Sequence, residues 1–187
     1  MFLITIVIII AMDEDASLVN APAATATEYG VTPLEVMASM SGLDFVHAMF
    51  AGKLPPPPIM RTIEPFDQSA DPGVVVFHST PGFRHYNPIS SVHGGYAATL
   101  LDSAMGLAVQ TMLPAGTGYT TLEFKISFIK GMTKETGPVR TEGRTLSVGR
   151  RAATAEARIV DTKGRLLAHA TTTCLVFELP ATSPVGS

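Results

Sequence analysis

Apolar and polar residues follow their most regular pattern in the second half of the chain, where the pattern predicts one long helix and then a strand. Within residues 94–112 apolar side chains recur every three to four positions and also cover much of the remaining surface, which is typical of a helix buried nearly all round. Beyond Pro114 and Gly116 the period changes to two, which predicts a half-buried strand. Its apolar positions are Leu122, Phe124, Ile126 and Phe128.

Other runs rich in β-branched and apolar residues predict further strands. These runs are residues 74–77 before the helix, and residues 139–148, 151–160 and 166–177 after it. Turn signals at Gly149 and within residues 161–164 separate the later runs, which implies antiparallel neighbours. The order of these elements predicts an α+β domain in which one antiparallel β-sheet wraps around a single central α-helix.

Two short helices are expected near the N-terminus. Thr32, Pro33 and Glu35 suit the N-cap, first and third positions of a helix that runs to about residue 40. Residues 41–44 open a second helix, which ends before the prolines of residues 55–58. We interpret the proline run as a stiff spacer that lies along its own domain, with an SH3-type ligand as the alternative.

The domain organisation expected from the sequence is simple. A flexible segment (1–31) precedes one domain (32–180), and a flexible tail (181–187) follows it. The apolar run near the start of the chain is too short to span a bilayer as a helix, so no stable membrane span is expected. A signal peptide requires a positively charged segment before its apolar run, but no Lys or Arg precedes this one. Acidic residues follow Met12. We therefore expect a natural start at Met12 and an artefactual leader at residues 1–11, with a targeting signal as the alternative.

Composition narrows the class of protein. The chain has 187 residues, of which 46% are hydrophobic and only 16% charged, so we expect partner subunits to cover part of the surface. A formal net charge of -3 provides no basic surface for nucleic acid. One cysteine, Cys174, cannot form an internal disulfide, which favours a reducing, cytoplasmic compartment.

Asp102 is the one acidic residue within the long apolar helix. An ionised carboxylate on a buried helix is costly unless it is paired, hydrogen-bonded or hydrated. Its helical neighbours Ala98, Gly106 and Val109 offer no partner, so the stabilising groups must come from another element or from solvent in a cleft. A salt bridge across a subunit interface is the alternative.

His93, Gly94 and Gly95 begin the same helix. Free amides and the positive end of the helix dipole favour an anion or an oxyanion at this position, and glycines let a ligand approach closely. Equally, a glycine pair can simply allow a tight turn. Gly94 precedes Asp102 by eight residues, or about 12 Å along the axis. One reacting atom could therefore contact both only if they came from different subunits of a symmetric dimer with antiparallel helices.

The motif "HGGYAATLLDSAMG" follows Asn87-Pro88 and precedes "TTLEFKISFIK". Together with "GKLPPPPI" and "SVGRRAATAEARIVD", it resembles the PaaI-type (phenylacetic-acid-degradation) acyl-CoA thioesterases of the hotdog-fold superfamily. The resemblance covers roughly residues 40–177. It implies a hotdog fold and hydrolysis of an acyl-CoA thioester to free acid and CoA.

The resemblance also implies roles for individual residues. Asp102 would be the general base or the nucleophile, and the backbone N–H of Gly94 would form the oxyanion hole. Asn87 and His93 would orient water and the thioester, and Thr121, or the adjacent Thr120, would assist the carboxylate. Few catalytic groups suffice because a thiol, with a pKa of about 8.5, is a good leaving group.

Substrate contacts are expected at Gly95 and Met105. Met105 would lie beside an apolar tunnel with Val109 and Phe124, and the resemblance suggests that Arg150 and Arg151 meet the phosphates or pantetheine arm of CoA. The histidines show no spacing typical of a metal site, so no metal is expected. No separate cofactor is expected either, since coenzyme A is part of the substrate.

The assembly expected is a homodimer with sites at the subunit interface, further paired as a dimer of dimers (a homotetramer). Aromatic and medium- or long-chain acyl groups both suit the expected tunnel. A non-catalytic acyl-CoA-binding hotdog module is the alternative to an enzyme. A hotdog hydratase is disfavoured because Asp102 lies about two turns into the helix rather than at its start.

Overall fold

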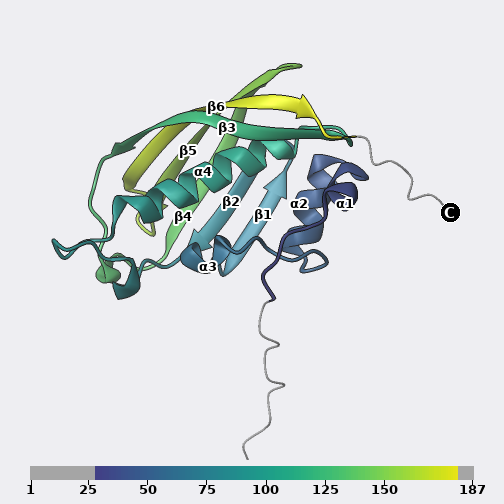
Figure 1. Ribbon diagram of the computed structural model, residues 1–187. Coiled ribbons are helices and arrows are strands. Elements are labelled where there is room, and N and C mark those ends of the chain that lie inside the picture. Colours follow the sequence, from purple (N-terminus) through teal and green to yellow (C-terminus); the bar gives the residue numbers. More distant parts are fainter. Residues whose placement is uncertain (1–27, 181–187) are drawn as a thin grey trace, which may run out of the picture.

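The computed structural model describes residues 28–180, which form one antiparallel sheet curved around one long helix (Figure 1). The sheet has six strands in the order β1-β2-β4-β5-β6-β3, and every neighbouring pair is antiparallel. The strands are β1 (Asp67–Asp71), β2 (Val74–Ser79), β3 (Thr117–Phe128), β4 (Val139–Val148), β5 (Ala152–Asp161) and β6 (Leu166–Glu178). The sequence-based predictions for residues 1–27, including the start at Met12, and for the tail 181–187 lie outside the described residues.

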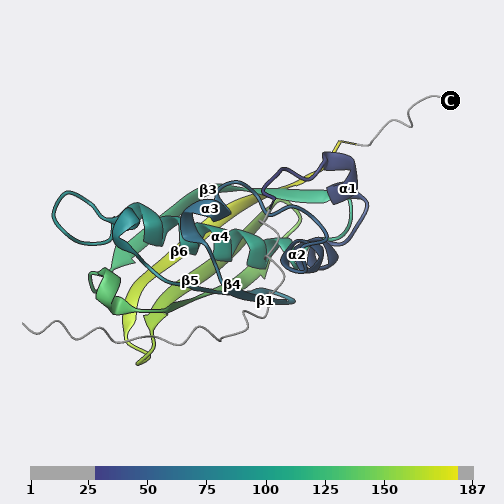
Figure 2. The same ribbon diagram turned by 90° about the horizontal axis from the view of Figure 1, so that it is seen from below.

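The long helix α4 (Gly94–Gln110) lies in the concave face of the sheet (Figures 1 and 2). Its buried side chains pack on the core-facing residues of the sheet. They include Leu100, Leu101, Ala104, Met105 and Ala108. Gly143 of β4 brings the sheet against the helix, because a β-carbon at this position would lie 2.8 Å from the Met105 nitrogen and closer still to the Ala104 carbonyl. The predicted α+β architecture around one central helix is therefore confirmed.

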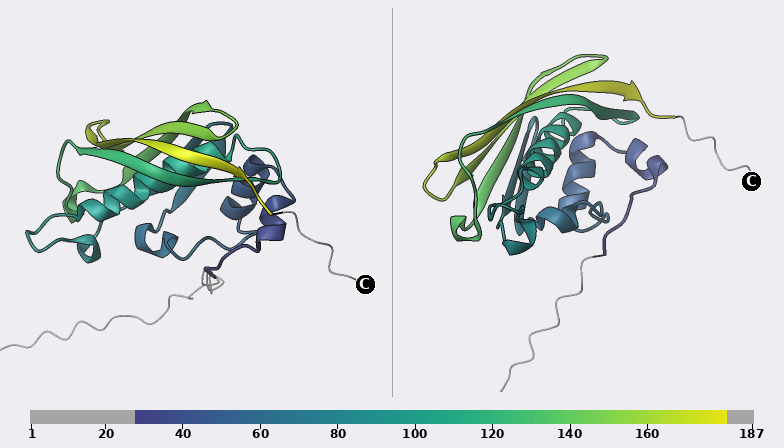
Figure 3. Two further views of the ribbon diagram at one scale, coloured as in Figure 1. Left: turned by 45° about the horizontal axis from the view of Figure 1, so that its top comes forward. Right: turned by 60° about the vertical axis from the view of Figure 1, so that its left-hand side comes forward.

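Three short helices precede α4 in the chain. They are α1 (Leu34–Ala38), α2 (Gly42–Phe50) and α3 (Met60–Ile63), and they lie beside the open edge of the concave face (Figures 2 and 3). As predicted, Ser41 opens α2, and its hydroxyl accepts the Asp44 amide at 3.2 Å. The N-cap predicted for α1 is wrong, since Pro33 occupies that position without a side-chain cap and the helix ends at Ala38.

The sequence prediction missed two single-turn 3-10 helices, η1 (Phe83–His85) and η2 (Lys134–Thr136), and two further elements. One is α3, a single turn that directly follows the proline run. The other is β1, whose sequence DQSAD has no apolar alternation because it is a largely exposed edge strand of the sheet. Both owe their form to contacts with neighbouring elements rather than to a local pattern.

The prediction that β3 is half-buried is wrong for the single chain. Leu122, Phe124 and Phe128 are exposed by 59%, 36% and 57%, respectively. Two causes are visible: β3 is the last strand of the sheet, and a bulge between Thr121 and Glu123 interrupts its alternation. Phe124 and Phe128 pair with Thr172 and Ala168, which are buried, so they share the core-facing side of the sheet but lie beyond the part of it that the described helices bury.

No helix within residues 28–180 has the length and apolar character needed to cross a membrane.

Candidate active site

Asp102 is half-buried on α4 and meets its hydrogen-bond donor on β3. The Thr121 hydroxyl donates to Asp102 Oδ1 at 3.1 Å. The neighbours of Asp102 one turn away on α4, Ala98 and Gly106, carry no polar side chain. The stabilising group therefore comes from another element. The structure places Thr121 against the carboxylate, whereas its neighbour Thr120 is exposed.

Asp102 lines a cleft of about 310 Å³ between the sheet, α4 and the N-terminal segment. Ser103 and Leu107 of α4 and Tyr119 and Thr121 of β3 line the same cleft. The opposite wall is largely apolar and consists of Gly30, Val31, Thr32, Met37, Phe45, Met49, Pro55, Pro57, Ile59 and Met60. An apolar cleft with a few convergent polar groups is the usual form of a small-molecule site.

The N-terminal wall is anchored to the rest of the domain. The Gly42 amide donates to the Leu113 carbonyl at 2.9 Å, and Gly42 packs so closely on Gln110 that no larger residue fits there. The Gly30 amide donates to the Pro56 carbonyl at 3.0 Å, which holds the start of the described chain against the proline run. The proline run thus lies along its own domain and contributes Pro55 and Pro57 to the cleft, as in the spacer interpretation.

Two groups near Asp102, the partly buried Tyr119 phenol and the buried Cys174 thiol, stay protonated at neutral pH. Burial, with smaller contributions from Cys174 and Asp102, raises the pKa of the Tyr119 phenol. Burial likewise raises the pKa of the Cys174 thiol, which lies opposite Thr121 in the pairing of β3 with β6. Neither group is available as an anionic nucleophile at neutral pH, and Asp102 is the acidic residue among those that line the described cleft.

The N-terminus of α4 presents one free amide. His93 is the N-cap, and its Nδ1 accepts the Gly95 N–H at 2.8 Å, so Gly95 has no amide to offer a ligand. The Gly94 N–H makes no hydrogen bond to another described residue. The Phe128 ring lies over Gly94, where a β-carbon would be 2.9 Å from Phe128 Cζ. An unused backbone N–H is therefore present at Gly94, two helical turns from Asp102, and its role as an oxyanion donor stays a prediction.

Asn87 is engaged in the loop before α4. Its Oδ1 accepts the amides of Ile89 and Ser91 at 3.0 and 3.1 Å, and its Nδ2 donates to the Ser91 hydroxyl at 2.9 Å. Within one subunit the side chain therefore shapes the loop that leads to His93. The predicted role of Asn87 and His93, to orient water and the thioester, stays a prediction.

The structure brings none of the four predicted substrate residues to the cleft, and Gly95 lies at the start of α4. Met105 is completely buried in the core with Val109, because both lie on the side of α4 that packs on the sheet. Arg150 and Arg151 occupy the β4–β5 turn, where Arg150 lines a separate hollow with Met112 and Pro114 past the C-terminal end of α4. Their contact with coenzyme A stays a prediction.

Sequence reasoning missed Tyr119 and the N-terminal wall of the cleft. Tyr119 had a usable signal, because it stands two positions before Thr121 and side chains of a strand alternate between faces. Met37, Phe45 and Met49 had none, because their place in the cleft depends on how α1 and α2 dock. Among residues 28–180, no group of three or more His, Cys, Asp or Glu side chains could hold a metal ion.

Comparisons with known proteins place this geometry in context. The family model of the thioesterase superfamily matches residues 90–168, which include α4, the Gly94 amide, Asp102 and Thr121. Comparison with curated proteins gave no match.

Several solved structures are similar to the chain. A phenylacetic acid degradation-related protein from Ralstonia eutropha JMP134 is 25% identical with a TM-score of 0.63, and the match covers 69% of this chain and 97% of that one. Zebra fish thioesterase superfamily member 2 is 24% identical with a TM-score of 0.61, covering 71% and 96%. A hypothetical thioesterase protein from Streptococcus pneumoniae TIGR4, solved with coenzyme A, is 24% identical with a TM-score of 0.58, covering 65% and 93%. These likenesses confirm the hotdog fold and the predicted resemblance.

Proposed function

We propose that this chain is a thioester hydrolase of the thioesterase superfamily and that it hydrolyses acyl-coenzyme A thioesters at Asp102 as a homodimer. The observation that carries the proposal is the Asp102 carboxylate, held by Thr121 at 3.1 Å on the wall of an apolar cleft. A similar solved structure, the thioesterase protein from Streptococcus pneumoniae TIGR4, holds coenzyme A and supports this choice of thioester. In this proposal coenzyme A is part of the substrate, and no metal or redox cofactor takes part.

The hydrogen bond to Asp102 leaves the carboxylate with capacity to react. Oδ1 receives the Thr121 proton, and Oδ2 makes no hydrogen bond to another described residue. As general base, the carboxylate takes a proton from water while the water oxygen bonds to the acyl carbon. The tetrahedral intermediate then breaks its C–S bond, and the coenzyme A thiolate leaves and takes up the proton. As nucleophile, the carboxylate itself displaces the thiolate, and water then hydrolyses the mixed anhydride.

In this proposal the oxyanion of the intermediate binds the Gly94 N–H, which does not lie near Asp102 of the same subunit. Gly94 and Asp102 are separated by about 12 Å along one helix, so the donor would be the Gly94 N–H of a second subunit. The free edge of β3 supports such a partner, because an unpaired edge strand with exposed apolar residues is a template for a second copy. Phe128 links the two features, since it is exposed near the end of β3 and lies over Gly94.

The acyl group would occupy the cleft, because its wall opposite Asp102 is largely apolar. Assembly of two such dimers into a tetramer and a cytoplasmic location remain predictions.

Release of free thiol from a panel of aliphatic and aromatic acyl-CoAs tests the proposal. Asp102→Asn and Asp102→Ala are expected to lose about 100-fold or more in turnover while they remain folded and oligomeric. Asp71→Asn, at an exposed position of β1, serves as the matched control and should keep wild-type turnover. Release of no thiol by wild type, or equal rates for the Asp102 variants, would overturn the assignment.

A further inference from the structure

The groove between α4 and β3 contains two facing pairs of residues. Asp102 and Gly106 are four residues apart on α4 and so share one face of the helix, about 6 Å apart along its axis. Thr121 and Tyr119 are two residues apart on β3 and so share one face of the strand. Thr121 meets Asp102, and Tyr119 meets Gly106. Tyr119 therefore stands one helical turn beyond the reactive carboxylate, towards the C-terminal end of α4.

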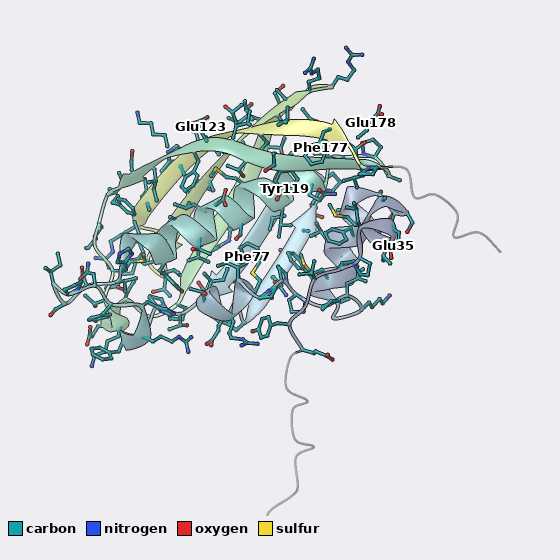
Figure 4. All side chains as sticks on the ribbon, in the orientation of Figure 1. Glu35, Phe77, Tyr119, Glu123, Phe177 and Glu178 are labelled. Atoms are coloured by element: carbon teal, nitrogen blue, oxygen red, sulfur yellow. The ribbon has the colours of Figure 1, made fainter. Side chains whose placement is uncertain are left out.

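Gly106 is what allows the Tyr119 ring to lie across the helix. A β-carbon at position 106 would be 2.8 Å from Tyr119 Cε2 and 2.9 Å from Cζ, and it would collide with the phenol oxygen. Figure 4 shows Tyr119 between β3 and α4. The phenol oxygen makes no hydrogen bond to another described residue.

The residues that line the cleft show what the ring does there. Ser103 and Leu107 flank position 106 on α4, and both line the cleft with Asp102. Tyr119 lines the cleft, whereas Gly106 is buried and does not line the cleft. The Tyr119 ring thus fills the space over Gly106 and forms part of the cleft wall between Asp102 and Leu107.

We infer that Tyr119 determines acyl specificity, with its ring narrowing the cleft one helical turn beyond Asp102 so that compact acyl groups fit better than long linear chains. This inference rests on the proposed function. The cleft volume of about 310 Å³ agrees with it, since this value lies near the lower limit of small-molecule pockets, about 300 Å³. An acyl group of compact form, whether aromatic or short and aliphatic, fills such a space without passing the ring.

The test is the value of kcat/KM for linear acyl-CoAs from butanoyl to palmitoyl, with phenylacetyl-CoA included. Wild type is expected to lose efficiency as the chain lengthens. Tyr119→Ala is expected to raise the ratio of long-chain to short-chain kcat/KM by about tenfold or more, because one methylene in an apolar pocket already discriminates by about 10-fold or more. Tyr119→Phe keeps the ring and should keep the wild-type profile, as should the neighbouring exposed control Thr120→Ala.

Gly106→Ala gives a second, independent readout. The new methyl group must displace the Tyr119 ring, so it is expected to change the chain-length profile in the wild-type background and to leave it unchanged in Tyr119→Ala. If Tyr119→Ala does not fold, Tyr119→Leu, which shortens the side chain but keeps it apolar, is expected to shift the profile in the same direction. If Tyr119→Ala is active and its chain-length profile is unchanged, the inference is overturned and the proposed function stays intact. The same holds for active Tyr119→Leu where the alanine variant does not fold. A wild type that hydrolyses no acyl-CoA overturns the proposed function itself.

Discussion

The Thr121 hydroxyl donates a 3.1 Å hydrogen bond to Asp102 Oδ1 and so joins the edge strand of the sheet to the central helix. The pair explains how a carboxylate is tolerated within an apolar helix. One oxygen is held by a donor from β3, and the side chain opens on a cleft rather than on the core. A hydrogen bond to a charged acceptor both stabilises the carboxylate and restricts its orientation.

Removal of the Thr121 hydroxyl is expected to slow the reaction without unfolding the protein. Thr121→Val keeps the shape of the side chain and should lower kcat by about 10-fold or more, because a hydrogen bond to a charged group contributes roughly 1.5–3 kcal/mol. Thr121→Ser restores the donor and should recover most of the rate. Thr120→Val is the control at the adjacent exposed position. A Thr121→Val enzyme as fast as Thr120→Val would show that the hydrogen bond has no part in catalysis.

The Gly94 amide can be removed with little disturbance of the helix. Gly94 is the first residue of α4, a position that proline tolerates, and His93 already has the extended conformation that proline requires before it (φ -62, ψ 137). Gly94→Pro should lower kcat by about 100-fold or more, as for loss of an oxyanion donor. Gly94→Ala adds a β-carbon at the same place beside Phe128 but keeps the N–H, so it is the matched control. Equal losses in the two variants would point to crowding by Phe128 instead.

Mixed dimers show whether Gly94 and Asp102 act across the interface. Gly94→Pro and Asp102→Asn chains are each inactive as homodimers, but one site of a mixed dimer would combine an intact Asp102 with an intact Gly94. Random reassociation of equal amounts should recover about a quarter of wild-type turnover, since half of the dimers are mixed and each has one functional site. A mixture that stays inactive after subunit exchange, verified by mass, would exclude the shared site.

Stability is expected to fall on the alkaline side of neutrality. Burial raises the pKa of both Cys174 and Tyr119 above the unfolded values of about 8.5 and 10, so above these values the unfolded state releases protons that the native state retains. The native state then binds more protons, and the free energy of unfolding decreases as pH rises. The urea midpoint should be constant up to about pH 8 and should fall by pH 10.

Cys174→Ala isolates the thiol contribution to this alkaline loss. The variant should show a smaller fall in urea midpoint between about pH 8 and pH 10, because only the Tyr119 contribution remains. Identical slopes for wild type and variant would contradict the assignment of the thiol.

The contact between β4 and α4 depends on the absence of a side chain at Gly143. Gly143→Ala places a methyl group against the Ala104 carbonyl, so the strand and the helix must move apart. We expect the free energy of unfolding to fall by about 1–3 kcal/mol in chemical denaturation. Gly131→Ala is the control, because a β-carbon there meets no atom within 4 Å. A Gly143→Ala midpoint equal to that of Gly131→Ala would mean that the helix accommodates the methyl group.

The sequence by itself determined the parts of the protein whose signals are local. The period of three to four located α4, and runs rich in β-branched and apolar residues between turn signals located β4, β5 and β6 almost to the residue, because both signals are local in the chain. The position of Asp102 in an apolar helix, with no partner one turn away, also predicted a cleft and a donor from another element. That donor is Thr121, and the cleft exists.

Only the tertiary structure decided which residues share the cleft and which lie in the core. Met105 was predicted to line the acyl site but packs on the sheet. Which face of α4 meets the sheet and which meets the cleft depends on how the helix packs in the domain. Phe45 and Met49 line the cleft because Gly42 lets α2 dock on the end of α4. Tyr119 lies over Gly106 because a strand and a helix far apart in the sequence pack together there. Such contacts join residues that no local period relates, and the packing of the whole domain sets them.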